Sequence, residues 1–135
     1  MGTLVDLDTW PKAEQFAFFK TFDRPHYAIT TRIDVTRLMS RKSAGLSVFR
    51  SCLWAIGAGL FAVPELRMRF VDDQVTLYDS LTLSPTIALE NGDFRYTYLT
   101  WTNNRADFDI SAKDKIASVR DGQPLNANDG SVKDV

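Results

Sequence analysis

The clearest periodic pattern in the first third of the chain is a strict alternation over residues 26–35. One face carries Tyr27, Ile29, Thr31, Ile33 and Val35, and the other carries His26, Ala28, Thr30, Arg32 and Asp34. A period of two residues is typical of a β-strand. The pattern therefore predicts a strand whose apolar face lies on a core.

Three helices are predicted around this strand. Thr9-Trp10-Pro11 indicates the start of the first, because proline suits the first helical turn and Glu14 follows near the positive end of the dipole. Thr36 can cap a short second helix that reaches Lys42 and is ended by Gly45. The third begins at Leu46 or Ser47, is apolar on most sides and stops at Pro64.

The second half of the chain predicts two hairpins and a last helix. Strands over 68–71 and 75–78 would join through Asp72-Asp73-Gln74, and strands over 82–89 and 93–101 through Glu90-Asn91-Gly92, where Asn-Gly favours a tight turn. Pro85 places its strand at an edge or a bulge. From Asn104 the period becomes helical, and the apolar positions are Phe108, Ala112, Ile116 and Val119.

This element order predicts an α+β fold, a two-layer sandwich of a mixed, largely antiparallel sheet with helices on one face. The late strands are joined by turns too short for parallel crossovers, which excludes a doubly wound sheet. The 135 residues, 44% of them hydrophobic, suffice for one domain.

The distribution of charged and apolar residues limits the classes of partner that the chain is expected to bind. Sixteen basic and seventeen acidic residues give a net charge of −1 without any run of one sign, so we expect neither a nucleic-acid nor a membrane-surface partner. Residues 46–63 are near the minimum length of a spanning helix but contain Arg50, so a buried helix is the better interpretation. The start of the chain has no signal-peptide pattern, and we expect a cytoplasmic protein.

Candidate chemistry is sparse. Cys52 is the only cysteine and lies in an apolar helical pattern, where a small buried side chain is the ordinary interpretation and a catalytic thiol the alternative. His26, the only histidine, has no cysteine or acid cluster at ligand spacing, so we expect no metal site. A structural or surface role is the expected one for His26, and a general base is the alternative. Asp72 and Asp73 are expected to be solvated turn acids, and Gly57 and Gly59 to admit another backbone to the helix.

The aromatic residues are more informative. Phe94, Tyr96 and Tyr98 share one strand face and could line an apolar pocket with phenol oxygens as polar groups. Core packing is the alternative interpretation of the same pattern.

Three segments carry a resemblance to a known family. TWPKAEQFAFFKTFDRPHYAITTRIDVT, PELRMRFVDDQVTLYDS and SPTIALENGDFRYTYLTW are similar to the chloramphenicol acetyltransferase family, over roughly residues 9–121. The family opens with a Trp and an aromatic-rich helix that leads into an aliphatic-Asp-aliphatic-Thr strand, and it later has an E-x-R motif before an acidic turn. The combination of these motifs is more specific than either alone.

The resemblance implies a coenzyme A-dependent acyltransferase-like fold and transfer of acetyl from acetyl-CoA to a hydroxyl of a small hydrophobic antibiotic, in a homotrimer. The family's general base lies in a His-His-x-x-x-Asp-Gly motif that these 135 residues do not contain, and His26 does not match it. We therefore expect residues 1–121 to be the amino-terminal part of such a domain, residues 122–135 to be a polar tail leading to an absent part, and the chain to be inactive alone. A non-catalytic relative, acting as a ligand-binding or oligomerisation module, is the alternative.

The resemblance also names acceptor-binding positions. By motif match these are Phe18, Phe19, Tyr27, Phe94 and Tyr96, and no catalytic residue is assigned. The family often has Tyr at the position of Phe19 and a small residue at that of Tyr96, so chloramphenicol is only the first candidate acceptor.

Overall fold

A computed structural model describes residues 1–122 and 132–135 of the chain. The sheet with the most strands among the described residues consists of β1 (Gly2–Leu4), β2 (Met68–Val71) and β3 (Gln74–Tyr78). The strands lie in the order β1-β3-β2, and each is antiparallel to its neighbour. The predicted hairpin of β2 and β3 is confirmed, and its register pairs Val71 with Gln74. β1 was not predicted from the sequence, because a strand of only three residues is too short to show a periodic pattern.

The turn of this hairpin is formed by Asp72 and Asp73 alone. Both have positive φ angles, of 51° and 60°. Two consecutive residues in this left-handed region make the tight turn that matches the twist of the flanking strands. Gln74, expected in the turn, is the first residue of β3 instead.

The second predicted hairpin is divided into two short antiparallel pairs. These are β4 (Thr82–Leu83) with β7 (Leu99–Thr100), and β5 (Thr86–Ala88) with β6 (Phe94–Tyr96). Pro85 lies between β4 and β5, where its missing N–H interrupts the ladder. In the β5–β6 turn Gly92 has a φ of 87°, as the Asn-Gly signal predicted, but Asn91 does not have the positive φ that a two-residue Asn-Gly turn requires.

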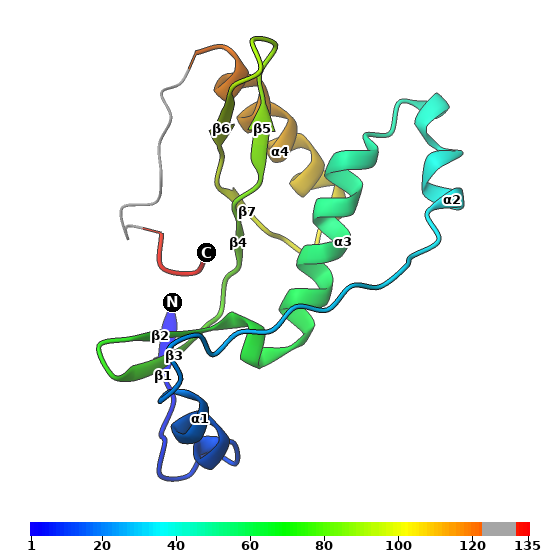
Figure 1. The fold of residues 1–135 in the computed structure, drawn as a ribbon. Coiled ribbons are helices and arrows are strands. Elements are labelled where there is room, and N and C mark those ends of the chain that lie inside the picture. Colours follow the sequence, from blue (N-terminus) through cyan, green and yellow to red (C-terminus); the bar gives the residue numbers. More distant parts are fainter. Residues whose placement is uncertain (123–131) are drawn as a thin grey trace.

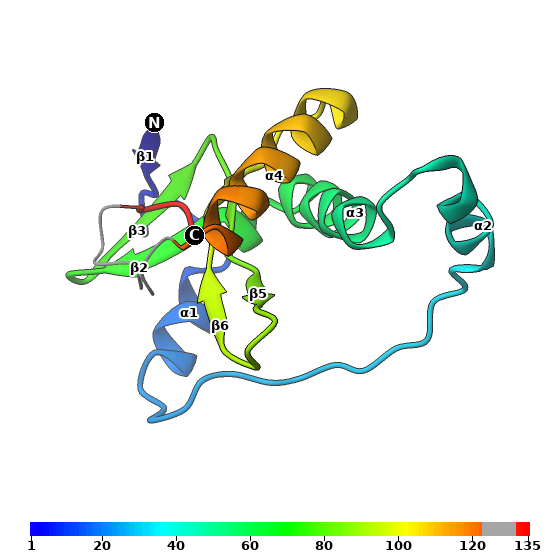
Figure 2. The same cartoon turned by 90° about the horizontal axis from the view of Figure 1, so that it is seen from above.

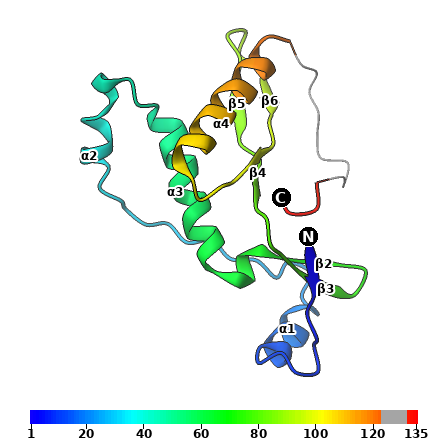
Figure 3. The ribbon, with the colours of Figure 1, turned by 180° about the vertical axis from the view of Figure 1, so that it is seen from behind.

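Two long helices cover one side of these short sheets (Figures 1 and 3). The first is α3 (Val48–Ala62), and the side chain of its N-cap residue Ser47 accepts a hydrogen bond from the Arg50 N–H. The second is α4 (Arg105–Arg120), which contacts β5, β6, β7 and α3. The four positions predicted to form its apolar face, Phe108, Ala112, Ile116 and Val119, are all buried. The α+β fold with helices on one face is thereby confirmed.

The core lies between these helices and the strands. Leu81, Leu83, Leu99, Trp101, Phe108 and Ala112 form its main cluster, and half-buried side chains of α3 pack against it. Gly57 makes this packing possible, because a Cβ built on it would lie 2.1 Å from the Trp101 Cδ1 atom. The glycine therefore admits a side chain to α3, and not another backbone as the sequence analysis expected.

The strand predicted for residues 26–35 is not formed. Figure 2 shows the chain between α1 (Ala13–Phe19) and α2 (Thr36–Met39) as a long arm with no strand beside it. No backbone hydrogen bond joins residues 26–34 to another described residue. Its apolar face is open: Tyr27, Ile29 and Ile33 are 86%, 79% and 76% exposed. The alternation alone does not make a strand, because a strand needs a neighbour to hydrogen-bond.

The second helix is shorter than predicted, and Thr36 is its first residue and not its N-cap, a position that Val35 occupies without a side-chain hydrogen bond. α2 ends at Met39 and is followed by the 3₁₀ turn η1 (Lys42–Ala44), which Gly45 ends with a φ of 82°. The Asp34 carboxylate accepts hydrogen bonds from the Thr36 N–H at 2.8 Å and from the Thr36 hydroxyl at 2.6 Å. The acceptor for the first N–H of the helix is therefore Asp34.

Residues 132–135 return to the strands. The Asp134 carbonyl accepts from the Thr82 N–H at 3.0 Å, and its carboxylate accepts from the Thr82 hydroxyl. The Val135 carbonyl accepts from the Arg69 Nε at 2.6 Å. Of the rest of the predicted polar tail, Gly122 follows α4 with a φ of 111°, and residues 123–131 lie outside the described residues. No helix in the described part of the chain is both long and apolar enough to span a membrane.

Candidate substrate-binding residues

Two of the five predicted acceptor-binding residues belong to an exposed aromatic cluster at the end of α1. The ring centroids of Phe18, Phe19 and Phe22 are 5.2 to 5.5 Å apart in edge-on pairs. All three rings are about half exposed or more. They present a continuous apolar surface, which is the kind of surface that binds an aromatic ligand.

α1 is attached to the β2–β3 hairpin by its other face. Phe16 packs edge-on against Phe70 with ring centroids 5.2 Å apart. The Lys20 ammonium lies 5.3 Å from the centre of the Phe70 ring and 2.8 Å from the Asp73 carboxylate. The hydrogen bond from Lys20 lowers the pKa of Asp73. Asp73 thus has a structural contact in addition to its place in the turn.

Two further predicted residues are neighbours on β6. Phe94 and Tyr96 lie on one face of the strand, two residues apart, and their rings meet edge-on with centroids 5.6 Å apart. Phe94 is exposed and Tyr96 half-buried. The expectation that Phe94 and Tyr96 share a face is confirmed, and neither is part of the buried core. Tyr98, expected on the same face, lies beyond the end of β6, and its place on that face stays a prediction.

The fifth predicted residue, Tyr27, is on the extended arm and does not meet the others. The structure thus holds the five residues in three places, with α1 at one end of the molecule and the β5–β6 hairpin at the other (Figure 1). It brings together Phe18 with Phe19 and Phe94 with Tyr96. A single acceptor pocket built from all five remains a prediction.

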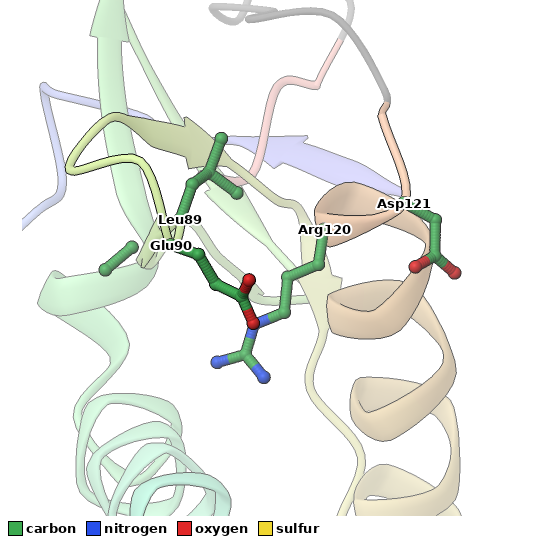
Figure 4. Close-up of a pocket in the computed structure, with 5 residues that line it drawn as sticks. Leu89, Glu90, Arg120 and Asp121 are labelled. Atoms are coloured by element: carbon green, nitrogen blue, oxygen red, sulfur yellow. The ribbon is translucent and has the colours of Figure 1, made fainter.

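One cavity, of about 690 Å³, lies where the β5–β6 turn faces the end of α4. It is lined by Ala88, Leu89, Glu90, Arg120 and Asp121. Figure 4 shows the side chains of Glu90 and Arg120 reaching toward one another, while the Asp121 carboxylate points away. These groups offer opposite charges to a ligand, and the described part of the lining contains no histidine, serine or cysteine.

A second, more apolar cavity of about 630 Å³ lies beside the start of α3. It is lined by Met39, Lys42, Leu46, Ser47, Val48, Phe49 and Cys52. Cys52 is half-buried there, and none of these lining side chains is a histidine or a carboxylate. The lining does contain a cation, Lys42, which is the kind of group that can stabilise a thiolate, so the packing role of Cys52 stays a prediction.

The other titratable candidates are dispersed. His26 is exposed on the extended arm. No three histidine, cysteine or acidic side chains come together at a metal-binding distance within residues 1–122 and 132–135.

Arg67, the arginine of the E-x-R motif, was given no role from the sequence. Its guanidinium carbon lies 4.3 Å from the centre of the Phe61 ring, and Nη1 donates to the Tyr78 carbonyl at 2.7 Å. Arg67 thereby joins η2 (Pro64–Arg67) and α3 to β3. Its Nε is buried without a hydrogen-bond partner among the described residues. The E-x-R motif draws attention to Arg67 in the sequence, but its structural role is identified only by these contacts.

Comparisons with known proteins agree with this arrangement. A solved chloramphenicol acetyltransferase superimposes with a TM-score of 0.80 at 29% identity, over 97% of this chain and 61% of that one. Chloramphenicol acetyltransferase 2 of Escherichia coli is 27% identical over 78 residues, 57% of this chain and 37% of the relative. A chloramphenicol acetyltransferase of Proteus mirabilis is 27% identical over 79 residues, 58% of this chain and 36% of the relative.

The matches to both curated relatives thus span just over a third of the relatives' length, and the match to the solved structure spans about three-fifths. The profile of the family described as chloramphenicol acetyltransferase matches residues 2–126, which is most of the chain. The chain belongs to the chloramphenicol acetyltransferase family.

Proposed function

We propose that this chain is the acceptor-binding part of an enzyme that transfers acetyl from acetyl-CoA to a hydroxyl of a small hydrophobic antibiotic, with chloramphenicol the first candidate. The reaction would break the thioester carbon–sulfur bond, form an ester at the acceptor oxygen and release free coenzyme A thiol. The supporting observation is the superposition on a chloramphenicol acetyltransferase over 97% of this chain.

The chain's own contribution would be to bind and orient the acceptor. Phe18 and Phe19 supply an exposed aromatic surface, Phe94 and Tyr96 supply a second one, and Tyr27 adds a phenol on the arm. Aromatic faces bind a hydrophobic acceptor, and a phenol oxygen can accept or donate a hydrogen bond to its polar groups.

Proton removal from the acceptor hydroxyl would not come from these residues. A general base must lie within hydrogen-bond reach of the hydroxyl and have a pKa near the working pH. The only imidazole, His26, is exposed on the arm and does not match the family's histidine motif. We therefore propose that the 135-residue chain alone does not turn over, and that the base belongs to a segment with the His-x-x-x-Asp-Gly motif.

An acetyl-transfer assay tests this proposal. Free thiol is measured with an aromatic disulfide reagent, which releases a coloured thiolate by exchange with the coenzyme A thiol, after mixing acetyl-CoA, chloramphenicol and either the 135-residue chain or the product of the complete reading frame. We expect thiol release from the second protein only. Release by the short chain that disappears in His26→Ala would contradict the assignment of the base.

Binding can be tested without turnover. We expect Tyr27→Ala and Phe94→Ala each to weaken chloramphenicol binding in a fluorescence titration. Ile110→Ala is the matched control, since Ile110 is also a large exposed apolar residue, at 61%, but lies on α4 outside the proposed site. Equal effects of all three substitutions would contradict the acceptor-binding assignment.

The exposed surface favours a second candidate function, a non-catalytic ligand-binding or oligomerisation module. The described residues expose several large apolar side chains, among them Tyr27 at 86%, Ile29 at 79% and Ile33 at 76%. Exposed apolar surface of this kind marks sites of interaction with a ligand or another chain. A defined oligomer, with the family's trimer the first candidate, that binds chloramphenicol without releasing thiol in size-exclusion and titration experiments would support the module.

A further inference from the structure

A third cavity lies between the end of α2 and the start of α4, away from the aromatic residues proposed to bind the acceptor. It has a volume of about 290 Å³ and is lined by Arg37, Leu38, Arg41, Leu46 and Arg105. Three of its five lining residues are thus arginines, in a chain whose net charge is −1. The lining contains no acid.

Arg37 and Arg41 are placed on the same side of the chain by the local backbone. Arg37 is in α2, and the backbone stays in the right-handed helical region through Ser40 and Arg41, where the Arg41 N–H donates to the Leu38 carbonyl at 3.2 Å. Side chains four residues apart on such a backbone are neighbours, and like charges in this relation repel. Within residues 1–122 and 132–135, neither guanidinium forms an ion pair with a carboxylate that would relieve this repulsion.

Arg105 reaches the same cavity from the first residue of α4. One of its terminal nitrogens donates to the Ser51 hydroxyl at 3.1 Å, which fixes the side chain against α3. The nearby acid, Asp109, already accepts two hydrogen bonds from Arg50, at 2.7 and 3.0 Å. The pKa of Asp109 is lowered mainly by its hydrogen bond with Arg50, and the charges of Arg105 and Lys113 add to this effect. The positive charge around the cavity therefore exceeds the negative charge available to balance it.

We infer that Arg37, Arg41 and Arg105 bind a phosphate group, either free or carried by a small phosphorylated molecule. Each guanidinium presents a planar fork of N–H donors that matches the oxygens of a phosphate. A doubly charged tetrahedral anion can accept from three such forks at once, whereas a single carboxylate has only two oxygens. Leu38 and Leu46 give the cavity an apolar wall against which an organic part of the ligand can pack. This site uses none of the acceptor-binding residues and requires no acetyl transfer.

Inorganic pyrophosphate is a suitable probe. We expect calorimetric titration of the 135-residue chain at low ionic strength to show saturable binding at one site. Arg37→Gln with Arg41→Gln should raise the dissociation constant at least tenfold. The matched control is Arg24→Gln with Arg32→Gln, which removes the same charge from exposed positions on the extended arm. It should change the constant by less than twofold, and circular dichroism should be unchanged in both variants.

The outcomes separate a built site from general attraction of anions. Absence of saturable binding to the unsubstituted chain, or equal weakening by the two double variants, would overturn the inference. A competition experiment then identifies the source of the phosphate. Displacement of pyrophosphate by coenzyme A, lost in the Arg37/Arg41 variant, would assign the site to a phosphate of that molecule. Pyrophosphate binding that coenzyme A does not disturb would assign it to a free anion. Failure of the acetyl-transfer assay would leave either result unaffected.

Discussion

The indole of Trp101 packs directly on the Cα of Gly57, in the middle of α3. The same indole donates to the Trp54 carbonyl at 3.0 Å and stacks on Phe61 with ring centroids 4.8 Å apart. In return the Trp54 Nε1 donates to the Thr102 carbonyl at 3.0 Å. The helix and the end of β7 are thereby held together at a distance that only a glycine permits.

Gly57→Ala should therefore destabilise the protein by about 1–3 kcal/mol, since the added methyl would overlap Trp101 and this overpacking exceeds the gain in helix propensity. Gly59→Ala on the same helix is the matched control, because no atom lies within 4 Å of a Cβ built there. It should stabilise by about 0.5–1 kcal/mol. Urea unfolding followed by tryptophan fluorescence measures both, and a Gly57→Ala variant as stable as Gly59→Ala would contradict the contact.

The start of α4 depends on Asn104. Its side-chain oxygen accepts from the N–H groups of Ala106 and Asp107 at 3.0 and 3.4 Å, which satisfies two donors that the helix leaves unpaired. Asn104→Ala should cost about 1 kcal/mol of unfolding free energy. The adjacent exposed Asn103 is the control, and Asn103→Ala should stay within about 0.5 kcal/mol of the unsubstituted chain. Equal losses in the two variants would argue against the cap.

The ion pair between Arg50 and Asp109 predicts a pH dependence. Hydrogen bonds from Arg50 lower the pKa of Asp109 below its ordinary value of 3.8. A carboxylate with a lowered pKa in the folded state contributes stability above its unfolded pKa and loses it as the pH falls through the folded one. The Asp109 side chain is 37% exposed, so solvent screening limits the contribution to about 1 kcal/mol or less.

Asp109→Asn should accordingly be less stable than the unsubstituted chain at pH 7, and the difference should shrink as the pH is lowered below about 4, through the folded pKa of Asp109. Asp114→Asn removes the same charge from an exposed position on α4 and is the matched control. Denaturant unfolding at a series of pH values measures the effect. A difference that stays constant down to acid pH would show that the pair makes no such contribution.

Local patterns were sufficient to predict most helices and turns. The apolar face of α4 and the Asp72-Asp73 turn depend on residues close in sequence, so periodicity and turn chemistry were enough. The relation of Gly57 to Trp101 was not predictable, because it joins residues far apart in the chain. The cavity lined by Arg37 and Arg105 could not be predicted for the same reason, since these two residues are also far apart in the chain.

The predicted acceptor-binding residues illustrate a different limit. Motif match supplied their names, but not their positions relative to one another. The structure joins them only where they are close in sequence, as in the pairs Phe18–Phe19 and Phe94–Tyr96. A strand over residues 26–35 was predicted from alternation, yet pairing depends on a neighbour that this pattern does not encode.

That unpaired arm leads to the last prediction. An isoleucine left in water forgoes about 1.5–3 kcal/mol of burial. An extended segment with alternating apolar residues and free backbone groups can also pair with another chain. We expect the 135-residue chain to self-associate through this face.

The double substitution Ile29→Thr with Ile33→Thr keeps β-propensity but removes the apolar surface, so it should shift the protein toward monomer and reduce the fluorescence of the apolar dye ANS. Ala28→Thr with Thr30→Ser changes the opposite face and should leave both unchanged. Sedimentation velocity at several concentrations measures the association, and an unsubstituted chain that is monomeric throughout would show that the exposed face does not drive it.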